Sequence, residues 1–275
     1  MTVTARFSPT LKHRLIQGAT MLPVCLVLGL AGCASSSKVD TTTTGAIAQP
    51  KTPADFQQAA DYWGQKYAAD PKNRDIDLNY ATALRRMGHS DQAVAVLQKA
   101  AIYFPDDREV LAEYGKALAA AGSYDQALDS IRRAETPDNP NWQLISAEAA
   151  ILDQMDHHAE ARTLYARALK YAPNEPSVLS NYGMSYVLTG ELPQAEKLLR
   201  QAIAASNADS RVRQNLALVV GLQGHFAEAE KIAGAEISPD QAQANVAYLR
   251  QMLAQRDTWQ ALKTNGQGQR GATSG

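Results

Sequence analysis

The 275-residue chain contains only two cysteines, few aromatic residues and no excess of charge of either sign. Its 27 lysines and arginines face 28 aspartates and glutamates, which gives a net charge of −1 at pH 7. This balance excludes the basic footprint of a nucleic-acid-binding protein, and aromatics at 7% of residues are too sparse for a base-stacking surface. Two cysteines cannot build the disulfide framework of a small secreted domain. The fold must therefore be held together by buried apolar side chains.

The sequence also lacks the motifs of the common enzyme classes. It contains no nucleophile elbow, no His-Glu-x-x-His, no phosphate loop and no Cys-x-x-Cys. His89, His157 and His225 are separated by equal intervals, so they should occupy equivalent turns of a repeating structure, too far apart to share a metal ion. The doublet of His157 and His158 has no obvious partner, which leaves an unrecognised enzyme as the weakest alternative. We expect no catalytic residue, cofactor, metal or small-molecule substrate.

What the sequence does have is a repeat with a fixed period. Alanine recurs at every thirty-fourth position through five units, as Ala93, Ala127, Ala161, Ala195 and Ala229. In the first four units a large residue follows four positions later and another alanine seven positions later, and a glycine precedes the alanine by five positions in four of the five units. Small residues at helix crossings, large residues beside them and a glycine at the reversal are typical of stacked helix-turn-helix units. The period predicts an all-α tetratricopeptide-repeat solenoid of about five repeats over residues 74–243.

Both ends of the repeat region carry additional helix signals. Thr52 and Pro53 form a helix start, and residues 53–73 match only the second helix of a repeat, which predicts an N-terminal half-repeat. A capping box beginning at Ser238 predicts a C-terminal capping helix within residues 240–262, running to about Gln255 and covering the last repeat. The tail, residues 263–275, is rich in glycine and glutamine and is expected to be disordered.

The N-terminal segment, residues 1–32, is typical of an export signal. Basic residues at positions 6, 12 and 14 precede an apolar stretch that polar residues, glycine and proline interrupt, so it is too short to span a bilayer. The stretch ends in Leu30-Ala31-Gly32-Cys33, which resembles the bacterial lipobox. This resemblance implies that residues 1–32 are removed and that Cys33 is acylated. Several acyl chains on one cysteine would anchor the protein to a membrane without a spanning helix.

Processing at Cys33 would change the composition of the mature chain. Loss of Cys25 and acylation of Cys33 would leave no free thiol, and 24 basic residues would face 28 acidic ones, a charge of −4. Residues 33–52 are rich in serine and threonine and should form a flexible tether. Ala34 stands where, in lipoproteins of enteric bacteria, an aspartate favours retention at the inner membrane. We therefore expect an outer-membrane lipoprotein that faces the periplasm.

The first helices of such repeats line a concave groove that can hold a segment of a partner protein. The position of each residue within its repeat predicts which side chains line this groove. The first repeats contribute an early, basic group and the last repeats a late, apolar group. The candidates are Asn79, Thr82, Arg85, Lys116, Asn181, Met184, Val187, Asn215 and Leu218. The alternatives are that the asparagines belong to the scaffold and that this face is simply solvated. The chaperone-binding carboxylate clamp is not favoured, because Leu78 and Thr82 stand where its residues would begin.

The lipobox, the tether, five repeats and a closing segment, residues 245–253 followed by Trp259, together resemble the TadD lipoproteins of the tight-adherence (Flp) pilus assembly machinery. The resemblance implies a pilotin-like role, in which the solenoid binds a secretin or another pilus-assembly protein at the outer membrane. The alternative from the residues is a general periplasmic adaptor that recruits cell-wall hydrolases or other envelope proteins.

Replacing the lipobox cysteine tests the membrane anchor. We expect Cys33→Ser to leave an unprocessed or soluble precursor, because serine offers no thiol for acylation. Membrane fractionation and the mobility of the protein on denaturing gels measure both effects. Replacing the signal cysteine instead, Cys25→Ser, is the matched control and should change neither. Recovery of the Cys33→Ser protein in the outer-membrane fraction would contradict the anchor.

Overall fold

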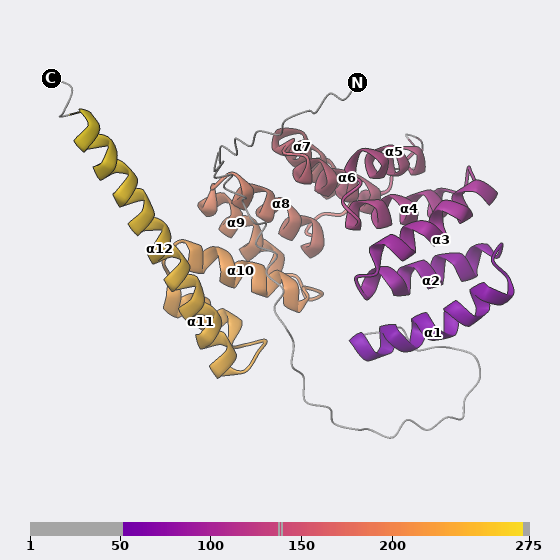
Figure 1. Ribbon diagram of the computed structural model, residues 1–275, viewed down its shortest axis with the longest axis horizontal. Coiled ribbons are helices and arrows are strands. Elements are labelled where there is room, and N and C mark those ends of the chain that lie inside the picture. The colour runs from indigo at the N-terminus through magenta and orange to yellow at the C-terminus, as the bar shows by residue number, and fades with distance from the viewer. Residues whose placement is uncertain (1–51, 137, 139, 272–275) are drawn as a thin grey trace, which may run out of the picture. The chain divides into compact units, whose positions relative to one another are not determined.

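The computed structural model describes residues 52–136, 138 and 140–271, with side chains described as far as residue 255. The predicted signal peptide, Cys33 and the tether lie outside the described residues, apart from Thr52. Within them the chain forms twelve helices and no strand (Figure 1). The helices are α1 Pro53–Ala69, α2 Arg74–Arg86, α3 Ser90–Tyr103, α4 Arg108–Ala120, α5 Tyr124–Ala134, α6 Trp142–Gln154, α7 His158–Tyr171, α8 Pro176–Leu188, α9 Leu192–Ile203, α10 Ser210–Leu222, α11 Phe226–Ala233 and α12 Pro239–Gly271.

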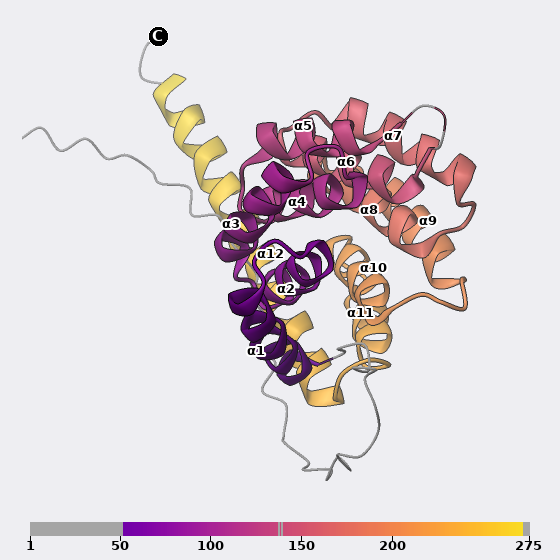
Figure 2. The ribbon, with the colours of Figure 1, turned by 90° about the vertical axis from the view of Figure 1, so that its right-hand side faces the viewer.

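Helices α2 to α11 form five antiparallel pairs that follow one another in chain order (Figures 1 and 2). The first helix of each pair contacts its own second helix and also the first helix of the next pair, as α2 contacts α3 and α4. One hydrophobic core after another fills the spaces between neighbouring pairs. The predicted all-α solenoid of five repeats is therefore confirmed in the described part of the chain.

The alanines that defined the period lie at the centre of this packing. Ala93, Ala127, Ala161 and Ala195 are completely buried, and Ala229 is 1% exposed. The large residues four positions later are also buried in the first four repeats, with Tyr165 the largest of them. The two helices of a repeat cross so closely that only a methyl group fits between them, and the larger side chain fills the space beside the crossing.

The turn between the two helices of a repeat requires a left-handed backbone conformation. Gly88, Gly122 and Gly190 have φ of +80°, and Gly224 has φ of +87°. In the third repeat Asp156 takes the same conformation with φ of 62°, although it carries a side chain. Aspartate tolerates this region better than most residues, which explains how the third repeat keeps the geometry without a glycine.

Helix α1 adds the second helix of an incomplete repeat at the N-terminal end. The Thr52 hydroxyl accepts from the Asp55 amide, and the Asp55 carboxylate accepts from the Thr52 amide, so the helix start is a complete capping box. Ala59 and Ala60 are buried against Ala83 of α2, and Tyr67 packs on Tyr80 with ring centroids 5.4 Å apart.

Helix α12 differs from the prediction in its length. The Ser238 hydroxyl accepts from the Gln241 amide, as expected for the predicted cap. The helix runs to Gly271, beyond the predicted end near Gln255 and into the segment that was expected to be disordered. No proline follows Pro239, and the segment from Arg256 to Lys263 contains good helix formers, whereas Gly266 and Gly268 further on are poor ones.

Enlarging a crossing alanine tests the packing. Ala161→Leu should destabilise the solenoid by about 1–3 kcal/mol, because the larger side chain has no space between α6 and α7. Thermal unfolding measured by circular dichroism gives the change. Ala166→Leu is the matched control, since Ala166 is an exposed residue of the same helix. Equal melting temperatures for the two variants would contradict this packing.

Asp77 in α2 breaks the pattern of the core. Leu111, Ile145 and Leu179 occupy the corresponding place in the next three repeats. Asp77 is fully buried, and neither of its carboxylate oxygens has a hydrogen-bond partner in the described part of the chain. Burial, with a smaller contribution from the charge of Asp70, raises the pKa of Asp77 to about 6. Near neutral pH the first repeat therefore holds a buried, unpaired carboxylate.

We predict that Asp77→Leu stabilises the protein at pH 8 by about 1–3 kcal/mol, because an unsatisfied buried polar group is removed. The folded pKa of Asp77 exceeds the unfolded value, so its contribution to stability is complete below about pH 4 and is lost as pH rises through 6. The difference between variant and wild type should therefore be smallest at pH 4 and largest above pH 7. Urea unfolding across this range measures it.

Exposed Asp61 of α1 offers a control for that measurement, since Asp61→Leu removes a carboxylate that is not buried. Its effect should be small and nearly independent of pH. If the difference in unfolding free energy between Asp77→Leu and wild type were constant from pH 4 to 8, the pKa of Asp77 would be the same in the folded and unfolded protein, which would contradict the prediction.

Candidate functional site

The predicted groove residues all lie on the first helices of their repeats. We call the surface formed by α2, α4, α6, α8 and α10 the first-helix face. Asn79, Thr82 and Arg85 lie on α2 and Lys116 lies on the neighbouring α4. The late residues lie on two further neighbours, with Asn181, Met184 and Val187 on α8 and Asn215 and Leu218 on α10. Helix α6, which carries none of them, separates the early group from the late one.

The early group borders a polar hollow of about 260 Å³ between α2 and α4. Its lining residues are Arg74, Asp75, Leu78, Asn79, Thr82, Glu109 and Glu113. The Arg74 guanidinium donates to carboxylates of three residues, at 2.6 Å for Asp107, 2.8 Å for Asp75 and 2.5 Å for Glu109. Its hydrogen bond lowers the pKa of Asp107, which also caps the start of α4.

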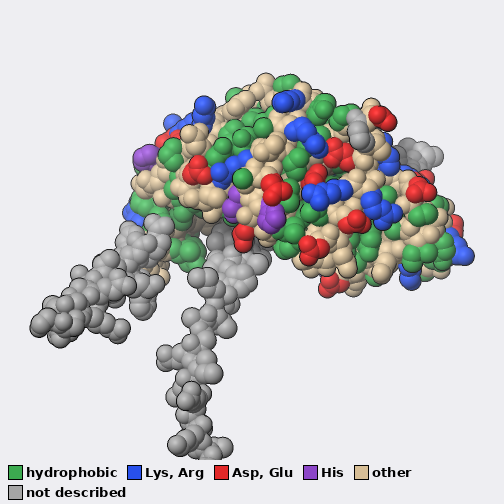
Figure 3. Space-filling model, turned by 90° about the horizontal axis from the view of Figure 1, so that it is seen from above, with side chains coloured by type: hydrophobic (Ala, Val, Ile, Leu, Met, Phe, Trp, Pro, Cys, Tyr) green, Lys and Arg blue, Asp and Glu red, His purple; other side chains and the backbone are tan. Residues whose placement is uncertain are grey.

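The structure corrects the charge expected at this end of the face. Arg85 and Lys116 both donate to Glu113, at 3.0 Å and 2.7 Å. Burial acts to raise the pKa of Glu113, but the charges of Lys116 and Arg85 outweigh it and the pKa falls below its usual value. Three acidic residues line the hollow beside these two cations, so the expectation of a basic end is wrong. Figure 3 likewise shows acidic and basic side chains interspersed on the side of the molecule that it displays.

A hydrogen-bonded cluster, which the sequence did not reveal, joins the third and fourth repeats. The buried Asp153 carboxylate interacts with His158 Nδ1 at 2.9 Å and accepts from Ser185 Oγ at 2.8 Å. Burial, followed by the charge of Asp153, raises the pKa of Tyr165 far above its ordinary value. Serine, histidine and aspartate are thus close together, but the Ser185 hydroxyl donates to Asp153 and not to His158. This is not the geometry in which a histidine activates a serine nucleophile.

An arginine and three tyrosines extend this cluster. The Arg162 guanidinium lies 4.0 Å from the ring centroid of Tyr186, and Tyr186 stacks on Tyr182 with centroids 5.4 Å apart. Tyr182 in turn stacks on Tyr165 at 5.7 Å. Arg162 also donates to the Ser185 carbonyl at 3.1 Å and to Glu191 at 2.8 Å. These contacts link α7 to α8, one of the helices of the first-helix face.

The three predicted asparagines have different environments. Asn79 Nδ2 donates to the Asp75 carbonyl of its own helix at 2.7 Å. Asn215 Nδ2 donates to Ser180 Oγ of the preceding repeat at 3.0 Å, which leaves its Oδ1 free to accept. The side-chain amide of Asn181 has no hydrogen-bond partner among the described residues, and the residue is half-buried. The scaffold alternative therefore fits Asn79, while Asn181 and part of Asn215 remain free for a ligand.

Around these asparagines the late part of the face is apolar. Met184, Val187 and Leu218 are half-buried, so each presents part of its side chain to solvent. Leu188, the last residue of α8, is 54% exposed. Free amide groups beside exposed apolar side chains can bind a segment of another protein through its backbone and its apolar side chains together.

The histidines at the turns lie where the repeat places them. His89, His157 and His225 are exposed and directly precede the second helix of their repeats. Within the described residues, no group of three His, Cys, Asp or Glu side chains is placed to hold a metal ion. In the same part of the chain no helix is long and apolar enough to cross a membrane.

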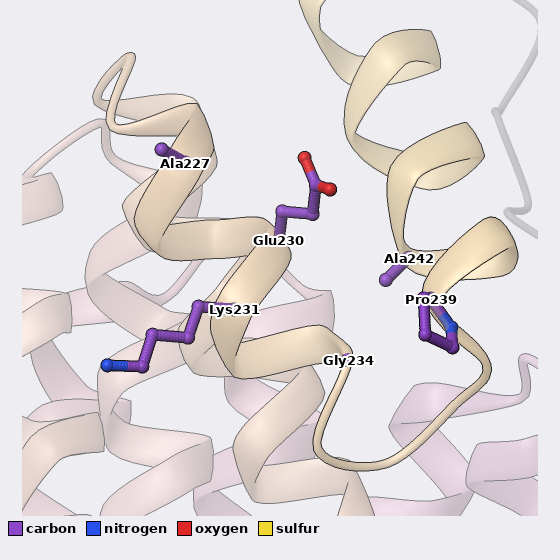
Figure 4. Close-up of a pocket in the computed structure, with 6 residues that line it drawn as sticks. All are labelled: Ala227, Glu230, Lys231, Gly234, Pro239 and Ala242. Carbon is purple, nitrogen blue, oxygen red and sulfur yellow. The ribbon is translucent and has the colours of Figure 1, made fainter.

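A second hollow, of about 330 Å³, lies away from the first-helix face, between α11 and α12. Figure 4 shows its lining residues, with Glu230 and Lys231 on α11 and the small side chains of Pro239 and Ala242 opposite them. Lys231 points away from the α12 side of the hollow in this view. The hollow thus lacks a converging set of polar groups, and the first-helix face is the better candidate site.

Residues 78–141 and residues 154–219 match two family models that are both described as tetratricopeptide repeat. A tetratricopeptide-repeat-containing protein of Dictyostelium discoideum is 28% identical over 124 residues, which are 42% of this chain and 47% of that protein. A protein of the same description from Pseudomonas aeruginosa is 29% identical over 125 residues, 45% of this chain and 21% of that protein. The chain thus spans less than half the length of these curated relatives.

Two solved structures share the arrangement of helices. A tetratricopeptide repeat protein from Parabacteroides merdae aligns with a TM-score of 0.61 at 14% identity, over 71% of this chain and 78% of that one. PilW, described as a widely conserved type IV pilus biogenesis factor, aligns with a TM-score of 0.57 at 16% identity, over 70% of this chain and 91% of that one. Identities this low show the fold alone. Together with the five helix pairs, these matches show that residues 78–141 and 154–219 carry tetratricopeptide repeats.

Proposed function

We propose that the chain is a non-enzymatic scaffold that binds a partner protein on the late part of its first-helix face. The observation that carries this proposal is the free amide of Asn181 among the partly exposed side chains of Met184, Val187 and Leu218. An amide offers a donor and an acceptor to a bound chain, and flexible apolar side chains adapt to its surface. The early part of the face is less suited, because Glu113 already neutralises Arg85 and Lys116.

We further propose a pilotin-like role in the assembly of a Tad/Flp pilus, with a secretin or another pilus-assembly protein as the partner. The sequence resemblance to TadD lipoproteins supports this role. The likeness to PilW, a type IV pilus biogenesis factor, is consistent with it at the level of the fold. Acylation of Cys33 would anchor the solenoid in the outer membrane and hold it in the periplasm, where such a partner passes.

The alternative is a periplasmic adaptor that recruits cell-wall hydrolases or other envelope proteins. It uses the same first-helix face and the same lipid anchor and differs only in the partner. The two functions are therefore distinguished by finding out which protein fails to assemble or to act in a cell that lacks this chain.

The test is to delete the gene in its own host and to measure secretin multimers in the outer-membrane fraction. We expect the multimers to be lost, to return with the wild-type chain, and to stay absent with Leu218→Asp, which places a charge on the apolar part of the face. Ile102→Asp is the matched control, because Ile102 is 72% exposed on α3, away from the first helices. It should restore the multimers.

Circular dichroism of the Leu218→Asp protein must show an unchanged melting temperature, so that loss of multimers reports on binding. Normal multimers and normal surface pili in the deletion strain would contradict the pilotin role and favour the adaptor. Full activity of a folded Leu218→Asp variant would contradict the assignment of the binding face.

A further inference from the structure

Helix α12 takes the place that the first helix of a sixth repeat would occupy. It contacts both α10 and α11, as the first helices of the second to fifth repeats each contact the two helices of the preceding pair. Ala242 and Val246 are buried, Ala242 against Ala217 and Ala233, and Val246 in the core that α10 and α11 share. In the second repeat Val110 of α4 is buried in the same way against the first pair.

Contacts between first helices fix the register of α12. In the fourth repeat Ser185, the tenth residue, donates to Asp153, the twelfth residue of the third repeat. Leu249 meets the twelfth residue of the fifth repeat, Gly221, so closely that a Cβ added there would lie 2.6 Å from Leu249 Cδ2. Leu249 is therefore the tenth residue of a sixth first helix, whose repeat begins at residue 240.

The fifth repeat is consequently shorter than the others by four positions. Helix α11 has 8 residues, whereas the other second helices of the five repeats have 11 to 14. The loss of about one turn brings α12 early onto the stack. If the 34-residue period of the alanines is simply continued, the sixth repeat begins four residues too late, and every residue of α12 is compared with the wrong position of the other repeats.

The corrected register aligns the exposed side chains of α12 with the binding face. Asn245 corresponds to Asn181 and Asn215, Tyr248 to Met184 and Leu218, and Met252 to Leu188 and Leu222. Tyr248 is 55% exposed and Met252 is 36% exposed, although both are large apolar residues. Like that of Asn181, the side-chain amide of Asn245 has no hydrogen-bond partner in the described part of the chain.

We propose that α12 is a third binding row, which with α8 and α10 forms one continuous site for an extended, uncharged segment of the partner. This inference rests on the proposed function of the first-helix face. The three rows carry asparagine and apolar side chains and no charged group at the corresponding positions, unlike α2 and α4, which carry Arg86, Glu113 and Lys116 there. Such a surface complements a segment whose contacting side chains are apolar.

The asparagines favour an extended segment over a helix. A helix satisfies its own backbone N–H and C=O groups, whereas an extended chain leaves them unpaired. Asn181 and Asn245 offer complete amides, and Asn215 offers its carbonyl oxygen. Neighbouring rows spaced about 8–10 Å apart match about three residues of an extended chain, at about 3.3 Å each.

Photo-crosslinking of the full chain in its own host tests this site. p-Benzoylphenylalanine replaces Leu218 in one strain, Tyr248 in a second and Ile102, as the control, in a third. We expect Leu218 and Tyr248 to crosslink to one segment of the same protein, at residues two to four apart when mapped by mass spectrometry, and Ile102 to give no such product. Tyr248→Ser combined with Met252→Ser should lower the yield at position 218 about tenfold, as loss of a binding hot spot would. Ile102→Ser should leave it unchanged.

Each other outcome has a distinct meaning. Crosslinks from position 218 but none from 248 would overturn the third row and leave the proposed function intact. Crosslinks from 248 to a second copy of this chain would make α12 a self-association surface and also overturn the inference. Partner residues six or seven apart would mean a bound helix, which rises only about 1.5 Å per residue, and would overturn the extended segment. No crosslink from either position would contradict the proposed face itself.

Discussion

Close approach of the two helices in each repeat is the constraint on which the rest of the structure depends. The approach leaves room for only a methyl group at Ala127 and for no side chain at Gly115, where an added Cβ would lie 2.7 Å from Ile131 Cγ1. Each pair leaves one apolar side that the next pair covers. The stability of the solenoid is therefore approximately a sum of contributions from single repeats and from the interfaces between neighbouring repeats. The same geometry sets the first helices side by side, which creates the candidate binding face.

Much of this could be predicted from the sequence, because a helix crossing selects residues by size. The recurring alanines gave the number of repeats, the register and the assignment of each groove candidate to a first helix. The turns were equally visible, and even the exception at Asp156 keeps the left-handed conformation of the glycines. The size of a residue at a helix crossing and the backbone conformation at a turn can both be predicted directly from the residue type.

Which charged side chains pair with one another could not be predicted from the sequence in this way. Arg85 and Lys116 indicated a basic surface, and the residue that neutralises them, Glu113, is itself in the sequence, but a period does not tell which side chains meet. The same holds for the cluster of Asp153, His158 and Ser185, whose members come from three helices. Long side chains reach several neighbours, so their partners follow from three-dimensional packing and not from spacing along the chain.

The shortened fifth repeat shows how a fixed period can hide the register of a helix. At the period of the first five repeats α12 looks like a cap, because its apolar residues do not fall on the repeat positions. The contact between Leu249 and Gly221 shifts the register by four positions, and Asn245 then continues the series of Asn181 and Asn215. A helix that only closes the core is expected to be polar wherever it meets solvent, yet α12 exposes Tyr248 and Met252 on the side that continues the first-helix face. Their exposure is explained if the helix binds a partner as well as closing the core.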